Sequence, residues 1–171
     1  MTLARPPIPL PDPPLRDGGL LLRPWAPADA PVLADAWADP EVARWTGVPE
    51  RADVTAAARW ISGEADRRAR GLALDVVIDL HGAVVGEVGL HQLDPVAGTV
   101  EIGWWVGAAH RGQGLAARAA RLLAPWAVQE LAICQVVARC HRDNPASAAV
   151  ARAAGFRPQA TPGEVEVWDL T

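Results

Sequence analysis

The chain has 171 residues, a formal net charge of −4 and 50% hydrophobic residues, which is typical of one soluble globular domain. This composition excludes a disordered chain, and the excess of acidic over basic residues argues against a nucleic-acid partner. The sequence contains no apolar run near the roughly 20 residues that a membrane helix needs. All sixteen basic residues are arginine, so Schiff-base enzymes and P-loop NTPases are excluded, while two cysteines indicate a reducing, cytoplasmic setting.

The first third of the chain predicts a proline-rich arm followed by a strand and two helices. Residues 1–18 are expected to form an extended or mobile arm before a single domain, 19–171. Asp29 and Asp53 are suitable N-caps for the two helices, and Gly71 ends the second. The predicted elements are strand 20–25, helices 29–37 and 53–70, strands 72–80, 83–93 and 99–106, a helix from 115, strand 135–140, helix 144–154 and strand 164–170.

The middle and C-terminal parts predict an α/β fold with a mixed sheet. The three strands within 72–106 are joined by short turns and must therefore be antiparallel neighbours. The period then changes to that of a helix, whose apolar residues from Leu115 to Trp126 share one face. Pro125 lacks a backbone donor, so a kink or break is expected near residues 121–125.

Residues 110–116, His-Arg-Gly-Gln-Gly-Leu-Ala, join a predicted strand to a predicted helix. The first amides of a helix have no partner within it and carry partial positive charge, so this junction suits a phosphate. Gly112 and Gly114 let the backbone approach an anion closely, and Arg111 adds a charge. A plain glycine-rich turn is the alternative. Gly112, Gly114 and Ala117 also fit a degenerate dinucleotide fingerprint, but the loop follows an antiparallel meander, which argues against nicotinamide or flavin binding.

The segment Arg111-x-x-Gly114-x-Ala116 resembles the acyl-CoA-binding signature of the GNAT N-acetyltransferase superfamily. Four further segments resemble, in the same order, its RimJ/RimL-like branch of ribosomal-protein N-terminal acetyltransferases and their relatives. These segments are Leu21-Leu22-Arg23-Pro24-Trp25 with Asp29-Ala30, Val85-Gly86-Glu87-Val88-Gly89-Leu90, Glu101-Ile102-Gly103-Trp104-Trp105-Val106, and Asn144-x-x-Ser147 with Ala154-Gly155-Phe156. The resemblance covers about residues 20–157.

This resemblance implies the GNAT fold, a mixed central sheet flanked by helices in which the strands before and after the main helix are splayed apart. It implies acetyl-CoA as the acyl donor, with its pantetheine arm between strands 99–106 and 135–140, and it implies no metal. The residues expected to bind the donor are Trp105, Val106, Arg111, Gly112, Gln113, Gly114, Leu115, Ala116 and Asn144.

Two residues are candidates for catalysis. In relatives a carboxylate on the strand before the loop deprotonates the substrate, so Glu101 is the candidate base; a structural carboxylate paired with an arginine is the alternative. The chain has no tyrosine to protonate the leaving thiolate, and the RimL-like pattern implies Ser147 in that role. Ser147 also fits the first turn of a helix capped by Asn144. His91 is a further candidate for a proton relay if its strand face points into the cleft.

The resemblance thus implies a cytoplasmic N-acyltransferase that moves an acetyl or related acyl group from acyl-CoA to a primary amine by direct attack. A non-catalytic acyl-CoA-binding or sensor module is the alternative. The acceptor is a protein N-terminus or a small molecule, and the fold is compatible with a homodimer. Trp37, Trp45 and Trp60 are expected in the core or in the wall of an acceptor pocket, and Arg67 at a solvated helix end.

Overall fold

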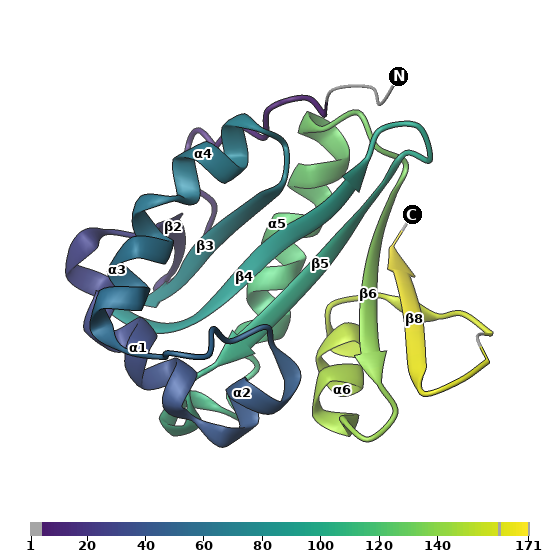
Figure 1. Ribbon diagram of the computed structural model, residues 1–171. Coiled ribbons are helices and arrows are strands. Elements are labelled where there is room, and N and C mark those ends of the chain that lie inside the picture. Colours follow the sequence, from purple (N-terminus) through teal and green to yellow (C-terminus); the bar gives the residue numbers. More distant parts are fainter. Residues whose placement is uncertain (1–4, 161, 171) are drawn as a thin grey trace.

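The computed structural model describes residues 5–160 and 162–170. Within them, eight strands form one sheet in the order β1-β2-β3-β4-β5-β6-β8-β7 (Figure 1). The strands are β1 (Arg16–Asp17), β2 (Leu20–Pro24), β3 (Ala73–Leu80), β4 (Ala83–Asp94), β5 (Thr99–Val106), β6 (Gln135–His141), β7 (Arg157–Pro158) and β8 (Val165–Leu170). The helices are α1 (Ala30–Ala38), α2 (Pro40–Trp45), α3 (Val54–Ser62), α4 (Glu64–Ala69), α5 (Leu115–Glu130) and α6 (Pro145–Ala153), with short 3-10 turns at Pro27–Asp29 and Ala108–His110. No helix in this part of the chain is both long and apolar enough to cross a membrane.

Strand pairing confirms the predicted mixed sheet. Strands β1 to β5 pair antiparallel in chain order, and β6, β8 and β7 continue antiparallel at the other side. Between the two sets, β5 and β6 pair parallel, because α5 carries the chain back to the end at which β5 began. The meander predicted from its short turns is β3-β4-β5.

The two faces of the sheet bury different clusters. On one face, side chains such as Leu74, Val88 and Ile102 pack with the buried residues of α5, and in the same cluster Ala151 of α6 is fully buried. On the other face, Val77 and Trp105 pack with α1 and α3. The sheet therefore lies between α5 and α6 behind it and α1 to α4 in front of it (Figure 1).

Three predicted helical features differ from the structure. The segment from residue 53 to residue 70 forms two helices, because Gly63 is a weak helix former and the Ser62 hydroxyl donates to the Arg59 carbonyl at 2.8 Å. Helix α2 was not predicted; Asp39 caps it by accepting from the Glu41 N–H at 2.9 Å. Of the kink or break expected near Pro125, the break does not occur, since the fully buried Leu123, Ala124 and Ala127 hold both sides of α5 against the core.

The described part of the proline-rich arm lies against the domain. Ile8 is 1% exposed and joins the cluster that contains α5. Its N–H donates to the Arg68 carbonyl at 3.0 Å, and the Arg68 guanidinium donates to the Ile8 carbonyl at 3.3 Å. Leu10 and Leu15 also pack on this cluster, so the arm contributes to the core.

Candidate active site

Strands β5 and β6 run together for four residue pairs and then part. The last parallel pair joins Ile102 to Ala138, so the remainder of β5 and of β6 has no partner on the facing edge. Figure 1 shows the two strands close at one end and diverging toward α2 and α6. The predicted splay is therefore confirmed, and it opens a gap whose edges carry backbone groups available to a ligand.

A cavity of about 440 Å³, called here the smaller cavity, lies where the strands part. It is bounded by the end of β5, the start of α5, one side of α6 and part of α2. Its residues include Trp104, Trp105, Val106, Arg111, Gly112, Gly114, Leu115, Ala116, Asn144 and Ser147. It contains all but one of the residues expected to bind the donor; the exception is Gln113.

The loop before α5 has the conformation that a helix N-terminal anion site requires. Gly112 has a φ of 74° and Gly114, the N-cap of α5, a φ of 72°, both in the left-handed region. A Cβ added at either would meet nothing within 4 Å, so the backbone angle rather than crowding requires glycine here. The first amides of α5 lack partners within the helix and lie beside the smaller cavity.

A second cavity of about 970 Å³, called here the larger cavity, adjoins the first. Six residues line both: Trp45, Thr46, Trp104, Trp105, Asn144 and Ser147. The larger cavity lies over the sheet face opposite α5. Trp37, Trp45 and Trp60 line it, and Trp37 and Trp60 also pack in the hydrophobic cluster with α1 and α3.

The floor of the larger cavity is formed by alternate residues of three strands. In register across β3, β4 and β5, Asp75 lies beside Gly89 and Gly103, while His91 lies beside Glu101, and Glu87 beside Trp105. Because side chains alternate along a strand, all of these positions share one face. Three acidic residues and one histidine thus gather around two glycines.

Comparisons with known proteins identify the family of the chain. The family model described as "Acetyltransferase (GNAT) domain" matches residues 19–157. The chain belongs to the GNAT acetyltransferase family. It is 28% identical to an N-acetyltransferase called p20 from Bacillus licheniformis over 142 residues, 82% of this chain and 80% of p20. It is 30% identical to the ribosomal-protein-serine acetyltransferase of Escherichia coli over 96 residues, 56% of this chain and 54% of that protein.

A solved structure extends the match over the whole fold. An acetyltransferase from Agrobacterium tumefaciens superposes with a TM-score of 0.76 at 27% identity, covering 98% of this chain and 99% of the other. The protein is accordingly a GNAT enzyme that transfers an acetyl group from acetyl-CoA to an amine, and a ribosomal-protein-serine acetyltransferase is among its relatives. Within the described residues no cluster of three or more His, Cys, Asp or Glu side chains is arranged to hold a metal.

In this acetyltransferase the predicted base, Glu101, is held by two partners. Its carboxylate accepts from Arg139 Nε at 2.9 Å and from Gln92 Nε2 at 3.2 Å, and 24% of its side chain is exposed. It lines the larger cavity, as a base should, but it also has the arginine partner of a structural carboxylate. Both sequence-based interpretations of Glu101 therefore remain.

Ser147 and Asn144 lie together at the junction of the two cavities. Asn144 caps α6, its side-chain oxygen accepting from the Ser147 N–H at 3.0 Å. The Ser147 hydroxyl donates to the Cys140 sulfur at 3.4 Å. Burial raises the pKa of the Cys140 thiol, so Cys140 stays a neutral thiol beneath the serine.

Arg111 is bound by two groups of the protein. Its guanidinium donates to Asp39 at 2.5 Å and to the Val106 carbonyl at 3.0 Å. These bonds tie the loop before α5 to the N-terminus of α2 and to the end of β5. Arg111 thus holds the wall of the smaller cavity, and Asp39 compensates its charge.

Sequence reasoning missed two acidic residues at the floor of the larger cavity. The side chain of Asp75 is 3% exposed and lies 3.4 Å from the Arg67 guanidinium and 3.6 Å from His91 Nε2. Burial raises the pKa of Asp75, although the charges of His91 and Arg67 oppose that shift. Arg67 is therefore no solvated helix end, since it pairs with Asp75 and covers the Trp60 ring at 4.2 Å. Two aspartates, Asp75 and Asp79, in an otherwise apolar strand were the available signal.

Glu87 is the second missed residue. It borders the larger cavity, and its carboxylate accepts from the indole N–H of Trp25 at 2.8 Å and of Trp105 at 3.2 Å. Loss of hydration, together with the negative charge of Asp75, raises the pKa of Glu87 to about 8. Glu87 therefore carries a proton at neutral pH and adds no charge to the floor.

Proposed function

We propose that this enzyme acetylates the N-terminal amino group of a protein, with acetyl-CoA in the smaller cavity and the N-terminal residues of the acceptor in the larger one. The observation that carries this proposal is the junction of the two cavities at Trp104, Trp105, Asn144 and Ser147. A thioester at the end of one cavity meets an amine at the end of the other only there.

The dimensions and charges of the larger cavity support a peptide as the acceptor. About 970 Å³ is at the upper end of small-molecule sites, so it leaves room for more than a single amine. Asp75 and Glu101 on its floor favour an ammonium group, while Arg44 and Arg139 can donate to the carbonyl oxygens or acidic side chains of a peptide. The name of the Escherichia coli relative, a ribosomal-protein-serine acetyltransferase, agrees with a protein acceptor.

In this proposal the donor is held mainly by the backbone. The diphosphate binds the N–H groups from Gly112 to Ala116, where the dipole of α5 favours negative charge. The pantetheine amides pair with the free edge of β5 at Trp105 and Val106, and Asn144 contacts the arm from α6. Arg111 acts by fixing the loop rather than by binding phosphate directly.

The proposed chemistry is direct transfer. The neutral amine attacks the thioester carbonyl, the tetrahedral intermediate collapses, and the CoA thiolate leaves with a proton from the Ser147 hydroxyl. For this, the hydroxyl turns from Cys140 toward the sulfur of the donor. Glu101, held by Arg139 and Gln92, either takes the proton of the ammonium or binds the ammonium as a fixed carboxylate.

Thiol release from acetyl-CoA tests this function. Unblocked peptides of varied N-terminal residue are compared with the same peptides Nα-acetylated, and the products are identified by mass spectrometry. We expect release only with the unblocked peptides and acetylation at the α-amine. Release with small amines but with no peptide would contradict a protein acceptor.

The two serines of the chain provide a matched pair of variants. Ser147→Ala is expected to lower kcat by about 10- to 100-fold, at the low end for general acid catalysis because a thiolate is a fair leaving group. Ser62→Ala, on an exposed helix end, is expected to leave kcat unchanged. Equal kcat values for the two variants would remove Ser147 from the mechanism.

A further inference from the structure

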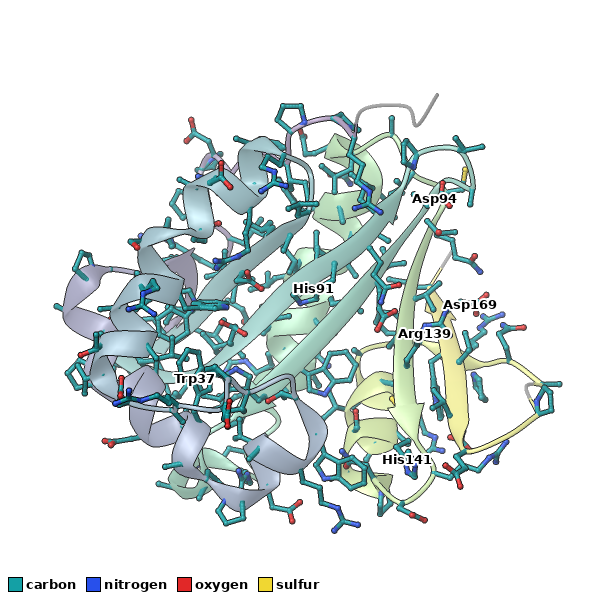
Figure 2. All side chains as sticks on the ribbon, in the orientation of Figure 1. Trp37, His91, Asp94, Arg139, His141 and Asp169 are labelled. Atoms are coloured by element: carbon teal, nitrogen blue, oxygen red, sulfur yellow. The ribbon has the colours of Figure 1, made fainter. Side chains whose placement is uncertain are left out.

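His91 lies in the centre of the cavity floor and is poorly explained as a structural residue. Its side chain is 41% exposed, and its Nε2 lies 3.6 Å from Oδ1 of the buried Asp75. Figure 2 shows His91 on the face of the sheet toward the viewer, in the stretch between the helices on one side and Arg139 of β6 on the other. The imidazole is therefore accessible from the cavity while one of its nitrogens faces a fixed carboxylate.

A glycine makes this approach of His91 to Asp75 possible. Gly89 precedes His91 on the same face of β4 and is the register partner of Asp75. A Cβ at Gly89 would lie 2.9 Å from His91 Nε2, closer than real Cβ atoms come, and 3.0 Å from Asp75 Oδ1, tighter than most real Cβ contacts. On the next strand, a Cβ at Gly103 would meet only His91, at 4.0 Å, so that position leaves open space beside the imidazole.

We propose that His91, oriented by Asp75, is the group that takes the proton from the ammonium of the acceptor. This inference rests on the proposed function and assigns its proton acceptor. With Nε2–H directed at Asp75, Nδ1 is the nitrogen with the lone pair. A separation of 3.6 Å exceeds a hydrogen bond, as catalytic contacts in an empty site often do, and it is expected to shorten when the acceptor fills the cavity.

His91 suits the role better than its register partner Glu101. The Glu101 carboxylate already accepts two hydrogen bonds, one of them from the guanidinium of Arg139 at 2.9 Å. Both bonds are made to the same carboxylate oxygen, so that oxygen is already occupied. His91, in contrast, faces a carboxylate with Nε2, which leaves the lone pair of its other nitrogen to take a proton.

Charged groups from five elements face this imidazole. They are Asp75 on β3, Glu87 on β4, Glu101 on β5, Arg67 on α4 and Arg139 on β6. The arginines pair with Asp75 and Glu101, and Glu87 holds a proton at neutral pH, so the charges around His91 nearly balance. The imidazolium formed in the reaction then gains most from Asp75, the carboxylate it faces directly.

The proton transfers balance without a further reactant. The ammonium gives one proton to His91 Nδ1, and the neutral amine forms the C–N bond as the thioester carbonyl becomes an oxyanion. Collapse breaks the C–S bond. The second proton of the attacking nitrogen passes, through Ser147, to the CoA thiolate. The imidazolium finally releases its proton to water, so one proton is produced per amide formed.

The pH dependence of His91→Ala tests this assignment. We expect kcat/KM for a peptide acceptor at saturating acetyl-CoA to fall about 100-fold or more near pH 6.5. The deficit should shrink above pH ~8, where an α-amino group loses its proton in solution. Added imidazole should restore part of the activity, and the KM for acetyl-CoA should not change. His81→Ala, a matched change in the distant β3–β4 turn, should match the wild type throughout.

Two further variants test the supporting residues. Asp75→Asn removes the charge that faces the imidazole and should lower kcat without changing the KM for acetyl-CoA. Gly89→Ala displaces the ring from Asp75 and should lower kcat at least tenfold without changing the KM for acetyl-CoA. Imidazole should not rescue Gly89→Ala, since the displaced ring still occupies the site.

The outcomes separate this inference from the function on which it rests. A wild type that releases no CoA with any amine would overturn the proposed function itself. If the wild type is active, an equal loss in His91→Ala at every pH, or no loss, would overturn the role of His91. If the fall of kcat/KM at low pH disappears in Glu101→Gln but persists in His91→Ala, Glu101 is the proton acceptor. If that fall disappears only in His91→Ala, the result supports the proposal.

Discussion

The substitution Glu87→Gln should reverse its effect on stability as the pH rises. In the folded protein the pKa of Glu87 is raised to about 8, against 4.5 for an ordinary glutamate. Between these values the folded state holds a proton that the unfolded chain releases, so raising the pH favours unfolding. The resulting loss in the free energy of unfolding is absent below pH ~4.5 and grows as the pH rises. Above pH ~8 it reaches its full value, on the order of 5 kcal/mol.

Glutamine avoids this penalty but has a fixed cost. Its carbonyl oxygen can accept from only one of the two indole N–H groups that Glu87 serves, Trp25 and Trp105. An unsatisfied buried donor costs about 1–3 kcal/mol. Glu87→Gln should therefore be less stable than the wild type at pH 5 and more stable at pH 8.5.

Urea unfolding at half-unit intervals from pH 5 to 9 measures this difference. Glu50→Gln makes the same chemical change at an exposed position and should leave the free energy of unfolding near that of the wild type at every pH. Parallel profiles for Glu87→Gln and the wild type would refute the reasoning, because they would show that Glu87 ionises alike in the folded and unfolded states.

Two other substitutions test the loop and the partly buried charges. Gly114→Ala and Gly82→Ala both place a side chain at positive φ, 72° and 90°, so each should lower the free energy of unfolding by about 1–2 kcal/mol. Only Gly114→Ala should also weaken CoA binding measured by calorimetry. Arg23→Met leaves Asp29 and Asp79 without the guanidinium that now donates to both, at 2.7 and 2.8 Å. It should cost about 3 kcal/mol at pH 7 and less at low pH, because Arg23 lowers the pKa of Asp29 and this contribution is lost as Asp29 gains a proton; equal costs at neutral and low pH in urea unfolding would contradict this account.

The sequence predicted those parts of the site that depend on local backbone signals. Gly112 and Gly114, placed between a predicted strand and a predicted helix, indicate a strand-to-helix loop. The short turns before and after β4 require an antiparallel meander. The parting of β5 and β6 was available only from the family resemblance, because no local pattern shows where two distant strands stop pairing.

The cavity floor could not be predicted in the same way. Asp75 and Glu87 interact across strands, and each has a pKa shift that arises from burial by helices far away in the sequence. Arg67 looked like a typical helix-terminal cation until its contact with Asp75 was seen. The family resemblance selected Glu101 on its strand but could not indicate that Arg139, from β6, would pair with its carboxylate.

In the proposed function, strand β5 separates the two substrates by using different parts of the same residues. The side chains of Glu101 and Trp105, with Gly103 between them, form part of the floor of the larger cavity, whereas the backbone edge of β5 beyond Ile102 faces the gap left by β6. A side-chain change on this strand can therefore alter the acceptor without disturbing donor contacts made by the backbone. By the same argument the donor cavity tolerates sequence drift in β5, because any residue except proline supplies the same N–H and C=O groups. Acceptor specificity should thus change with the side chains at the floor while acetyl-CoA affinity stays constant.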